Sequence, residues 1–147
     1  TTLWSAALDN TEVKKYPDRE LNHYIAFNSD QLDQTAKQYG VSREDMLKQY
    51  DLDDEDEFNA VNEDSSKLRV KQEMLIQYIA DKENLSYTDK EKEALIKSFE
   101  AQGYDADAIE QQTGRTLEDY VHIELLYEKV LDFLLDNANI TGAPTTE

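Results

Sequence analysis

The chain has 147 residues, enough for one compact domain or for an elongated helical unit. Its 33 acidic residues outnumber its 15 basic ones, so phosphate backbones and anionic membranes would repel it, and neither nucleic acid nor a membrane is expected as a partner. The absence of cysteine excludes disulfides, thiolate zinc sites and a cysteine nucleophile. A hydrophobic content of 39% with nine tyrosines nevertheless indicates that much of the chain folds.

The first predicted element is a long helix over residues 17–40. Pro17 suits the first turn of a helix, and Gly40 suits the position just beyond its end. The apolar residues between them form only a narrow stripe, which is interrupted at Asn28 and Ser29. We therefore expect this helix to be partly buried.

Two more helices are predicted in the middle of the chain. Ser42 followed by Asp45 is typical of a helix N-terminus and opens a short helix that runs to about Tyr50. An acidic run then favours the start of a long helix, over residues 53–81, because acidic side chains interact well with the N-terminal end of the helix dipole. Within it, residues 59–66 are polar nearly all round, which indicates either a solvated rod or a break.

Three helices are predicted in the last third of the chain. Thr88 and Glu91 form a capping box that opens a helix ending at Gly103. A short helix covers residues 105–113, and Thr116 caps the last helix. Apolar residues surround that helix on more than one side, so it is expected to contribute to a core. The residues expected to be core there are Leu126, Val130 and Leu134.

Nothing in the sequence is arranged for bond chemistry. The acidic run that begins at Asp51 invites comparison with a calcium-binding loop, but Asp56 stands where such a loop needs Gly, and Asn62 where it needs a bidentate Glu. His23 and His122 have no second ligand at helical spacing, so no metal site is expected. With no nucleophile–base pair and no phosphate-binding loop, we expect no catalytic residue, no cofactor and no enzyme activity in this chain.

Apolar side chains on the first long helix are candidates for binding other polypeptides. That helix carries too few of them to be fully buried, so part of its stripe is expected to remain accessible. Trp4, in contrast, lies in a short N-terminal apolar stretch and is expected to anchor that stretch on the domain. No alternating strand pattern is visible, so the predicted fold class is all-α. The candidate polypeptide-binding residues are Tyr24, Phe27, Leu32 and Tyr39.

Four segments resemble, in the same order, segments of the trigger factors, which are ribosome-associated bacterial chaperones. LWSAALDNTEVKKYPDREL resembles the segment that follows their isomerase domain, and QYGVSREDMLKQY resembles their short helix after the first arm. VKQEMLIQYIADKENLSYTDKE resembles an apolar helix followed by a capped one, and YEKVLDFLLDNANI resembles their C-terminal helix. The resemblance predicts a C-terminal chaperone domain over residues 1–140, and the loop-like tail at 141–147 is expected to be disordered.

The resemblance implies an elongated multi-helix domain with arm-like extensions, which binds nascent or unfolded polypeptides through scattered apolar patches. It also implies a cytoplasmic parent protein. Ribosome contact is expected only through an N-terminal domain, and prolyl isomerase activity only through an FKBP-like domain, both missing from this sequence. The residues leave an alternative open: a helical adaptor or dimerisation module of an extracytoplasmic chaperone-like protein, which binds one fixed partner or forms a homodimer.

Overall fold

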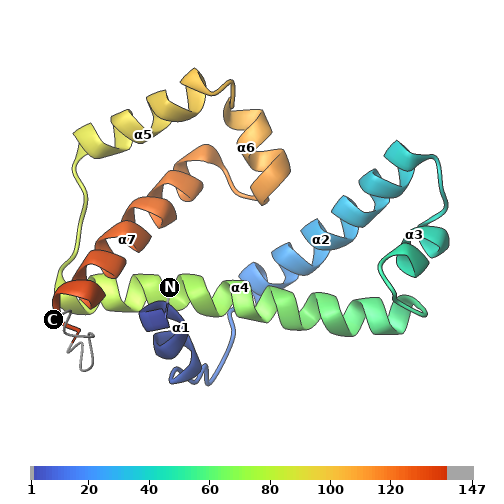
Figure 1. Ribbon diagram of the computed structural model, residues 1–147, viewed down its shortest axis with the longest axis horizontal. Helices are drawn as coiled ribbons and strands as arrows, with labels where there is room; N and C mark the ends of the chain where they lie inside the picture. Colours follow the sequence, from blue (N-terminus) through green and yellow to red (C-terminus); the bar gives the residue numbers. More distant parts are fainter. Residues whose placement is uncertain (1, 139–147) are drawn as a thin grey trace, which may run out of the picture. The chain divides into compact units, whose positions relative to one another are not determined.

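The computed structural model describes residues 2–138, which contain seven helices and no strand, so the predicted all-α class is confirmed. The tail predicted to be disordered, residues 141–147, lies outside the described residues. None of the helices in the described part is long and apolar enough to cross a membrane. In chain order the helices are α1 (Thr2–Asp9), α2 (Asp18–Tyr39), α3 (Arg43–Gln49), α4 (Glu55–Glu83), α5 (Asp89–Ala101), α6 (Ala106–Thr113) and α7 (Leu117–Asp136) (Figure 1).

The chain forms two compact units. Unit 1 consists of Thr1–Glu12 and Met74–Glu147, and unit 2 consists of Val13–Glu73. Helix α4 therefore contributes its first part to unit 2 and its last part to unit 1. Each unit has its own apolar cluster.

The helix ends follow the capping residues that the sequence predicted. The hydroxyl of Ser42 accepts a hydrogen bond from the backbone N–H of Asp45 at 3.1 Å, and Thr88 with Glu91 completes a capping box. Gly40 ends α2 in the left-handed conformation, with φ of 67°, where a residue with a Cβ would be strained. These local contacts explain why the boundaries can be read from sequence. The caps of the last two helices are Asp105 and Thr116.

Two helices end at left-handed residues other than glycine, a feature that the sequence analysis did not identify. Asp51 follows α3 with φ of 58°, and Asn84 follows α4 with φ of 54°. The backbone N–H of the next residue then bonds back to a carbonyl in the preceding helix, at 3.0 Å for Leu52 and 2.8 Å for Leu85. Each of these leucines packs against the apolar cluster of its own unit. Asp51 therefore turns Leu52 inward.

Unit 1 is built around α7, which contacts α1, α5 and α6. Trp4 is buried in its apolar cluster and meets Tyr127 edge to face, with ring centroids 5.1 Å apart, so its predicted anchoring role is confirmed. The stretch around Trp4 is a helix, which the sequence analysis did not identify. Leu126 and Val130 are buried as predicted, whereas Leu134 is half-buried at the edge of the cluster. The buried members are Trp4, Leu8, Leu75, Ile76, Ala80, Leu126 and Val130.

Helix α5 has no buried residue, and ion pairs tie it to α7. Lys129 donates a hydrogen bond to Glu91, and Lys92 donates one to Glu118 at 2.6 Å. The hydrogen bond from Lys129, together with those from the backbone and hydroxyl of Thr88, lowers the pKa of Glu91 to about 2. The carboxylate of Glu91 thus serves both the cap of α5 and its attachment to α7.

In unit 2, α2 runs at an angle to the first part of α4, and α3 closes the end at which the two helices diverge (Figure 1). An apolar cluster fills this closed end, and both buried residues of α3, Met46 and Leu47, belong to it. The buried members of the cluster are Leu32, Ala36, Met46 and Leu47, with Val41, Leu52 and Phe58 packed against them.

Beyond this cluster, the contact between α2 and α4 includes a group of hydrogen-bonded polar side chains. Asn62 is only 3% exposed; its side-chain oxygen accepts from Asn28 at 2.8 Å, and its nitrogen donates to the backbone carbonyl of Ile25 at 2.9 Å. Ser66, also buried, donates to the Asn62 side chain at 3.3 Å. Of the two alternatives predicted for residues 59–66, the break is wrong, because α4 is continuous there, and the solvated rod is largely confirmed, because most of these residues are exposed. Asn62 and Ser66 are the exceptions, since they are buried against the gap in the stripe of α2.

Replacing Leu126 by Ala should lower the free energy of unfolding by about 2–5 kcal/mol, because it opens a cavity in the cluster of unit 1. Urea denaturation followed by the fluorescence of Trp4, the single tryptophan, measures this change. Leu135→Ala is the matched control on the same helix, since Leu135 is 59% exposed and its loss should cost less than about 0.5 kcal/mol. Equal effects of the two substitutions would contradict this assignment of the core.

Glu91→Gln should make stability less sensitive to acid. The folded pKa of Glu91 lies below its ordinary value of 4.5, so its charge stabilises the fold above that value and the contribution is lost as pH falls toward about 2. Gln keeps an acceptor for the cap but does not titrate. The melting temperature of the variant, followed by circular dichroism, should therefore fall less than that of the wild type over this pH range. Glu100→Gln, an exposed position on the same helix, should melt in parallel with the wild type.

Candidate functional site

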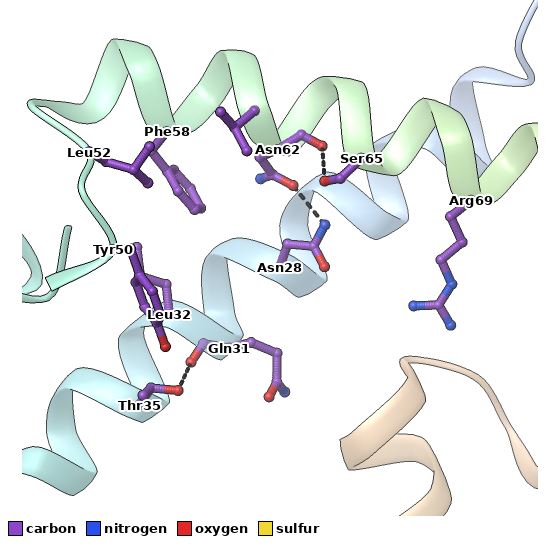
Figure 2. Close-up of a pocket in the computed structure, with 11 residues that line it drawn as sticks. Asn28, Gln31, Leu32, Thr35, Tyr50, Leu52, Phe58, Asn62, Ser65 and Arg69 are labelled. Carbon is purple, nitrogen blue, oxygen red and sulfur yellow. Dashed lines mark hydrogen bonds between the residues drawn. The ribbon is translucent and has the colours of Figure 1, made fainter.

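A pocket with a volume of about 550 Å³ lies within unit 2, between α2, α4 and the segment that joins α3 to α4 (Figure 2). This volume is in the range of sites that hold a small molecule or a few side chains of a polypeptide. Apolar and aromatic side chains line one end, and amide and hydroxyl groups line the middle. The lining residues are Asn28, Gln31, Leu32, Thr35, Tyr50, Leu52, Phe58, Val61, Asn62, Ser65 and Arg69.

The apolar end of the pocket combines buried and exposed side chains. Leu32 of α2 is buried in the cluster of unit 2, and Leu52 is held beside it because Asp51 turns the chain inward. Tyr50 is 57% exposed and Val61 is 52% exposed, so these two side chains form an outer rim. The rim leaves apolar surface in contact with water, which a binding partner can cover.

Arg43 of α3 organises this end of the pocket. Its guanidinium bonds both carboxylate oxygens of Glu55, at 2.7 and 3.1 Å, and also Asp33 at 2.8 Å and the backbone carbonyl of Ser29 at 3.2 Å. It lies over the ring of Phe58, 4.9 Å from the centroid. The hydrogen bonds from Arg43 to Glu55 and then to Asp33 raise the pKa of Arg43 above its ordinary value, so the group stays charged.

The middle of the pocket is a wall of hydrogen-bonded polar groups. Figure 2 shows the amide of Asn28 bonded to Asn62, the hydroxyl of Ser65 donating to the backbone carbonyl of Asn62, and the hydroxyl of Thr35 donating to that of Gln31. These bonds fix the orientation of the side chains. The wall offers amides and hydroxyls next to apolar surface. This combination matches a polypeptide, which carries polar backbone groups and apolar side chains along the same chain.

His122 is half-buried in a packed position, and His23 is exposed on α2. His122 lies 2.8 Å from the hydroxyl of Tyr87 and 3.3 Å from the side-chain oxygen of Gln77, and the ring of His23 meets that of Tyr24. Among residues 2–138, no group of three acidic or histidine side chains is placed to hold a metal ion.

Tyr24, one of the predicted polypeptide-binding residues, lies in the interior of unit 2. It is 2% exposed, and its hydroxyl donates to the carboxylate of Glu73 at 2.9 Å. The guanidinium of Arg69 covers the ring at 4.0 Å from its centroid. The ring therefore contributes to packing between α2 and α4.

The other three predicted residues are distributed along α2. Leu32 lines the pocket while also packing in the apolar cluster. Phe27 is half-buried and Tyr39 is 69% exposed, and neither is among the residues that line the pocket. The structure therefore brings only Leu32 of the four into the pocket.

Most of the apolar lining was missed by the sequence analysis. These residues lie within or next to the acidic run, whose charge suggested a calcium loop and a helix start: Tyr50, Leu52, Phe58 and Val61. The spacing of Phe58, Val61 and Ser65 does follow one face of a helix, and this periodicity was available in the sequence.

Known proteins match this chain over most of its length. Residues 1–136 match the family model of the "Bacterial trigger factor protein (TF) C-terminus". Trigger factor of Bacillus mycoides (strain KBAB4) is 29% identical over 122 residues, which are 82% of this chain and 27% of that protein. The chain thus spans less than a third of the length of this curated relative, and no solved structure matches it. The matched region is the C-terminal one, and the isomerase domain is not present in this chain. Because the family model covers residues 1–136 of 147, the chain belongs to the bacterial trigger factor family, of which it represents the C-terminal domain.

Proposed function

We propose that this chain binds unfolded or nascent polypeptides, and that the pocket of unit 2 is one place where it does so. Membership of the trigger factor family supports the proposal, and one observation carries it: an exposed apolar rim at Tyr50 and Val61 adjoins a wall of amide and hydroxyl groups. The apolar side chains of a bound polypeptide, here called the client, would be transferred from water to the rim. The backbone of the client would form hydrogen bonds with the wall. Such contacts do not require one particular client sequence.

We assign different roles to the four residues predicted to bind a client. Leu32 forms the inner surface of the pocket. Phe27 and Tyr39 are proposed as outlying contacts on α2, where each adds a weak interaction to a multivalent surface. Tyr24 acts by holding α2 against α4, because its ring and hydroxyl are already occupied within unit 2.

The acidic character of the chain should influence which clients it binds. The formal charge is −18, and the acidic run from Asp51 to Glu57 contains the pocket-lining Leu52 and directly precedes Phe58. Basic segments of a client would be drawn to this end of the pocket, and salt would weaken the attraction. We therefore propose a preference for clients in which apolar and basic residues alternate.

The remaining functions belong to the parent protein in this proposal. Peptidyl-prolyl isomerase activity is assigned to an FKBP-like domain outside this chain, and ribosome contact to an N-terminal domain. The parent is proposed to be cytoplasmic, and the chaperone domain to extend over residues 1–140.

Val61→Asp should weaken client binding about tenfold, because it places a charge on the apolar rim of a pocket that is already surrounded by acids. The measurement is fluorescence anisotropy with labelled ribonuclease A that has been reduced and carboxamidomethylated so that it stays unfolded. Leu68→Asp is the matched control: Leu68 is 51% exposed on the same helix but does not line the pocket, and its replacement should have a much smaller effect.

Two results would overturn this proposal. Equal effects of Val61→Asp and Leu68→Asp would show that the pocket has no special part in binding. Failure of the wild-type chain to bind the unfolded probe, combined with saturable self-association in sedimentation experiments, would favour the adaptor or homodimer alternative. A prolyl isomerase assay on a peptide substrate should show no catalysis by this chain.

A further inference from the structure

We propose that Arg43 is a positioning residue that sets the shape of the apolar end of the pocket, by fixing Phe58 and the first turn of α4 against α2. This inference rests on the proposed function, since it concerns the same pocket. Arg43 does not line the pocket itself, but its guanidinium contacts the ring of Phe58, which does.

The first step of the argument is geometric. Arg43 lies at the start of α3, yet its side chain contacts both neighbouring helices of unit 2. On α2 it bonds the carboxylate of Asp33 and the backbone carbonyl of Ser29, and on α4 it bonds Glu55 through two nitrogens. A planar guanidinium can serve these acceptors at once because its donors form a rigid fork, whereas a lysine ammonium acts as a single point charge.

The second step concerns charge. The side chains of Asp33 and Glu55 are about half exposed, at 48% and 50%, and Arg43 is the cation that both of them contact. Glu55 stands within an acidic run that also contains Asp53 and Asp56. Without Arg43 the acids at the start of α4 and Asp33 would repel each other across the closed end of unit 2. The first turn of α4 would then move away from α2.

The third step connects this movement with the pocket. The ring of Phe58 packs against the apolar cluster of unit 2, lies beneath the guanidinium and lines the pocket. Phe58 lies one helical turn after Glu55, so a shift of Glu55 carries the ring with it. The apolar end would widen, and a client side chain would lose contact with Phe58 and with Leu52 beside it.

Arg43→Gln tests the proposal with Lys48→Gln as the matched control. Lys48 carries the same charge on the same helix, but it pairs only within α3, with Glu44 at 2.8 Å. Affinity for the labelled, carboxamidomethylated ribonuclease A should fall about tenfold in Arg43→Gln and stay near the wild-type value in Lys48→Gln. Equal affinities of the two variants would overturn the proposal.

A double-mutant cycle shows whether Arg43 acts through Phe58. If it does, the double variant Arg43→Gln, Phe58→Leu should bind the probe no more weakly than Phe58→Leu alone. Additive losses would show that Arg43 affects binding by another route and would overturn the proposal. A residue with a merely structural role would give no such specific coupling to one ring of the pocket.

Folding is checked by helical circular dichroism, with the emission of Trp4 as a control for unit 1. If Arg43→Gln loses helical signal, the comparison is made with Arg43→Lys, which keeps the charge but not the fork. Wild-type affinity in Arg43→Lys would then overturn the proposal, and weakened affinity would support it. The Val61→Asp variant distinguishes failure of the inference about Arg43 from failure of the proposed function of the pocket. If Val61→Asp weakens binding while the Arg43 variants do not, only the inference about Arg43 fails. If Val61→Asp has no effect on binding, the proposed function of the pocket fails.

Discussion

The contact between the side-chain amides of Asn28 and Asn62 determines how unit 2 is assembled. Beyond the cluster at the closed end, the one fully buried residue of α2 is Tyr24, so hydrophobic packing alone would leave the register of the two helices poorly defined. A slip by one turn would leave both amides, and the buried hydroxyl of Ser66, without partners, at a cost of about 1–3 kcal/mol for each group. Since Phe58 and Ser65 face the pocket from the same helix, the register that these amides select also fixes the lining of the pocket.

The chain has a low apolar content, and different kinds of contact stabilise its two units. Unit 1 concentrates its large side chains around α7 and forms a continuous apolar cluster. Unit 2 uses a small cluster at one end, ion pairs through Arg43 and buried amides along the rest of the helix contact. The polar side chains between these helices are fixed by hydrogen bonds to one another, and Tyr50 and Val61 remain exposed beside them.

Features that depend on neighbouring residues could be predicted from the sequence, and those that depend on distant partners could not. Caps such as Ser42 involve residues a few positions apart, and the resemblance to trigger factors rests on local segments in a fixed order, so helices α2 to α7 and the family were predicted correctly. Helix α1 was missed because so short a helix is stabilised by packing rather than by its own sequence. The burial of Asn62 and Ser66 could not be predicted because their partner, Asn28, lies on another helix. The burial of Tyr24 likewise follows from contacts with α4, and the importance of Val61 emerges only when the helices are paired.

Unit 1 joins the two ends of the described chain, and this has a consequence for the order in which the protein is made. Trp4 is synthesised well before Tyr127, the residue on which it packs. Polypeptides leave the ribosome from the N-terminus at about 5–20 residues per second, so the N-terminal apolar stretch waits several seconds for its partner. Residues 13–73, in contrast, contain all the internal contacts of unit 2 and can be complete while α7 is still being synthesised. A domain that we propose to protect unfinished chains therefore passes through the same unfinished condition during its own synthesis.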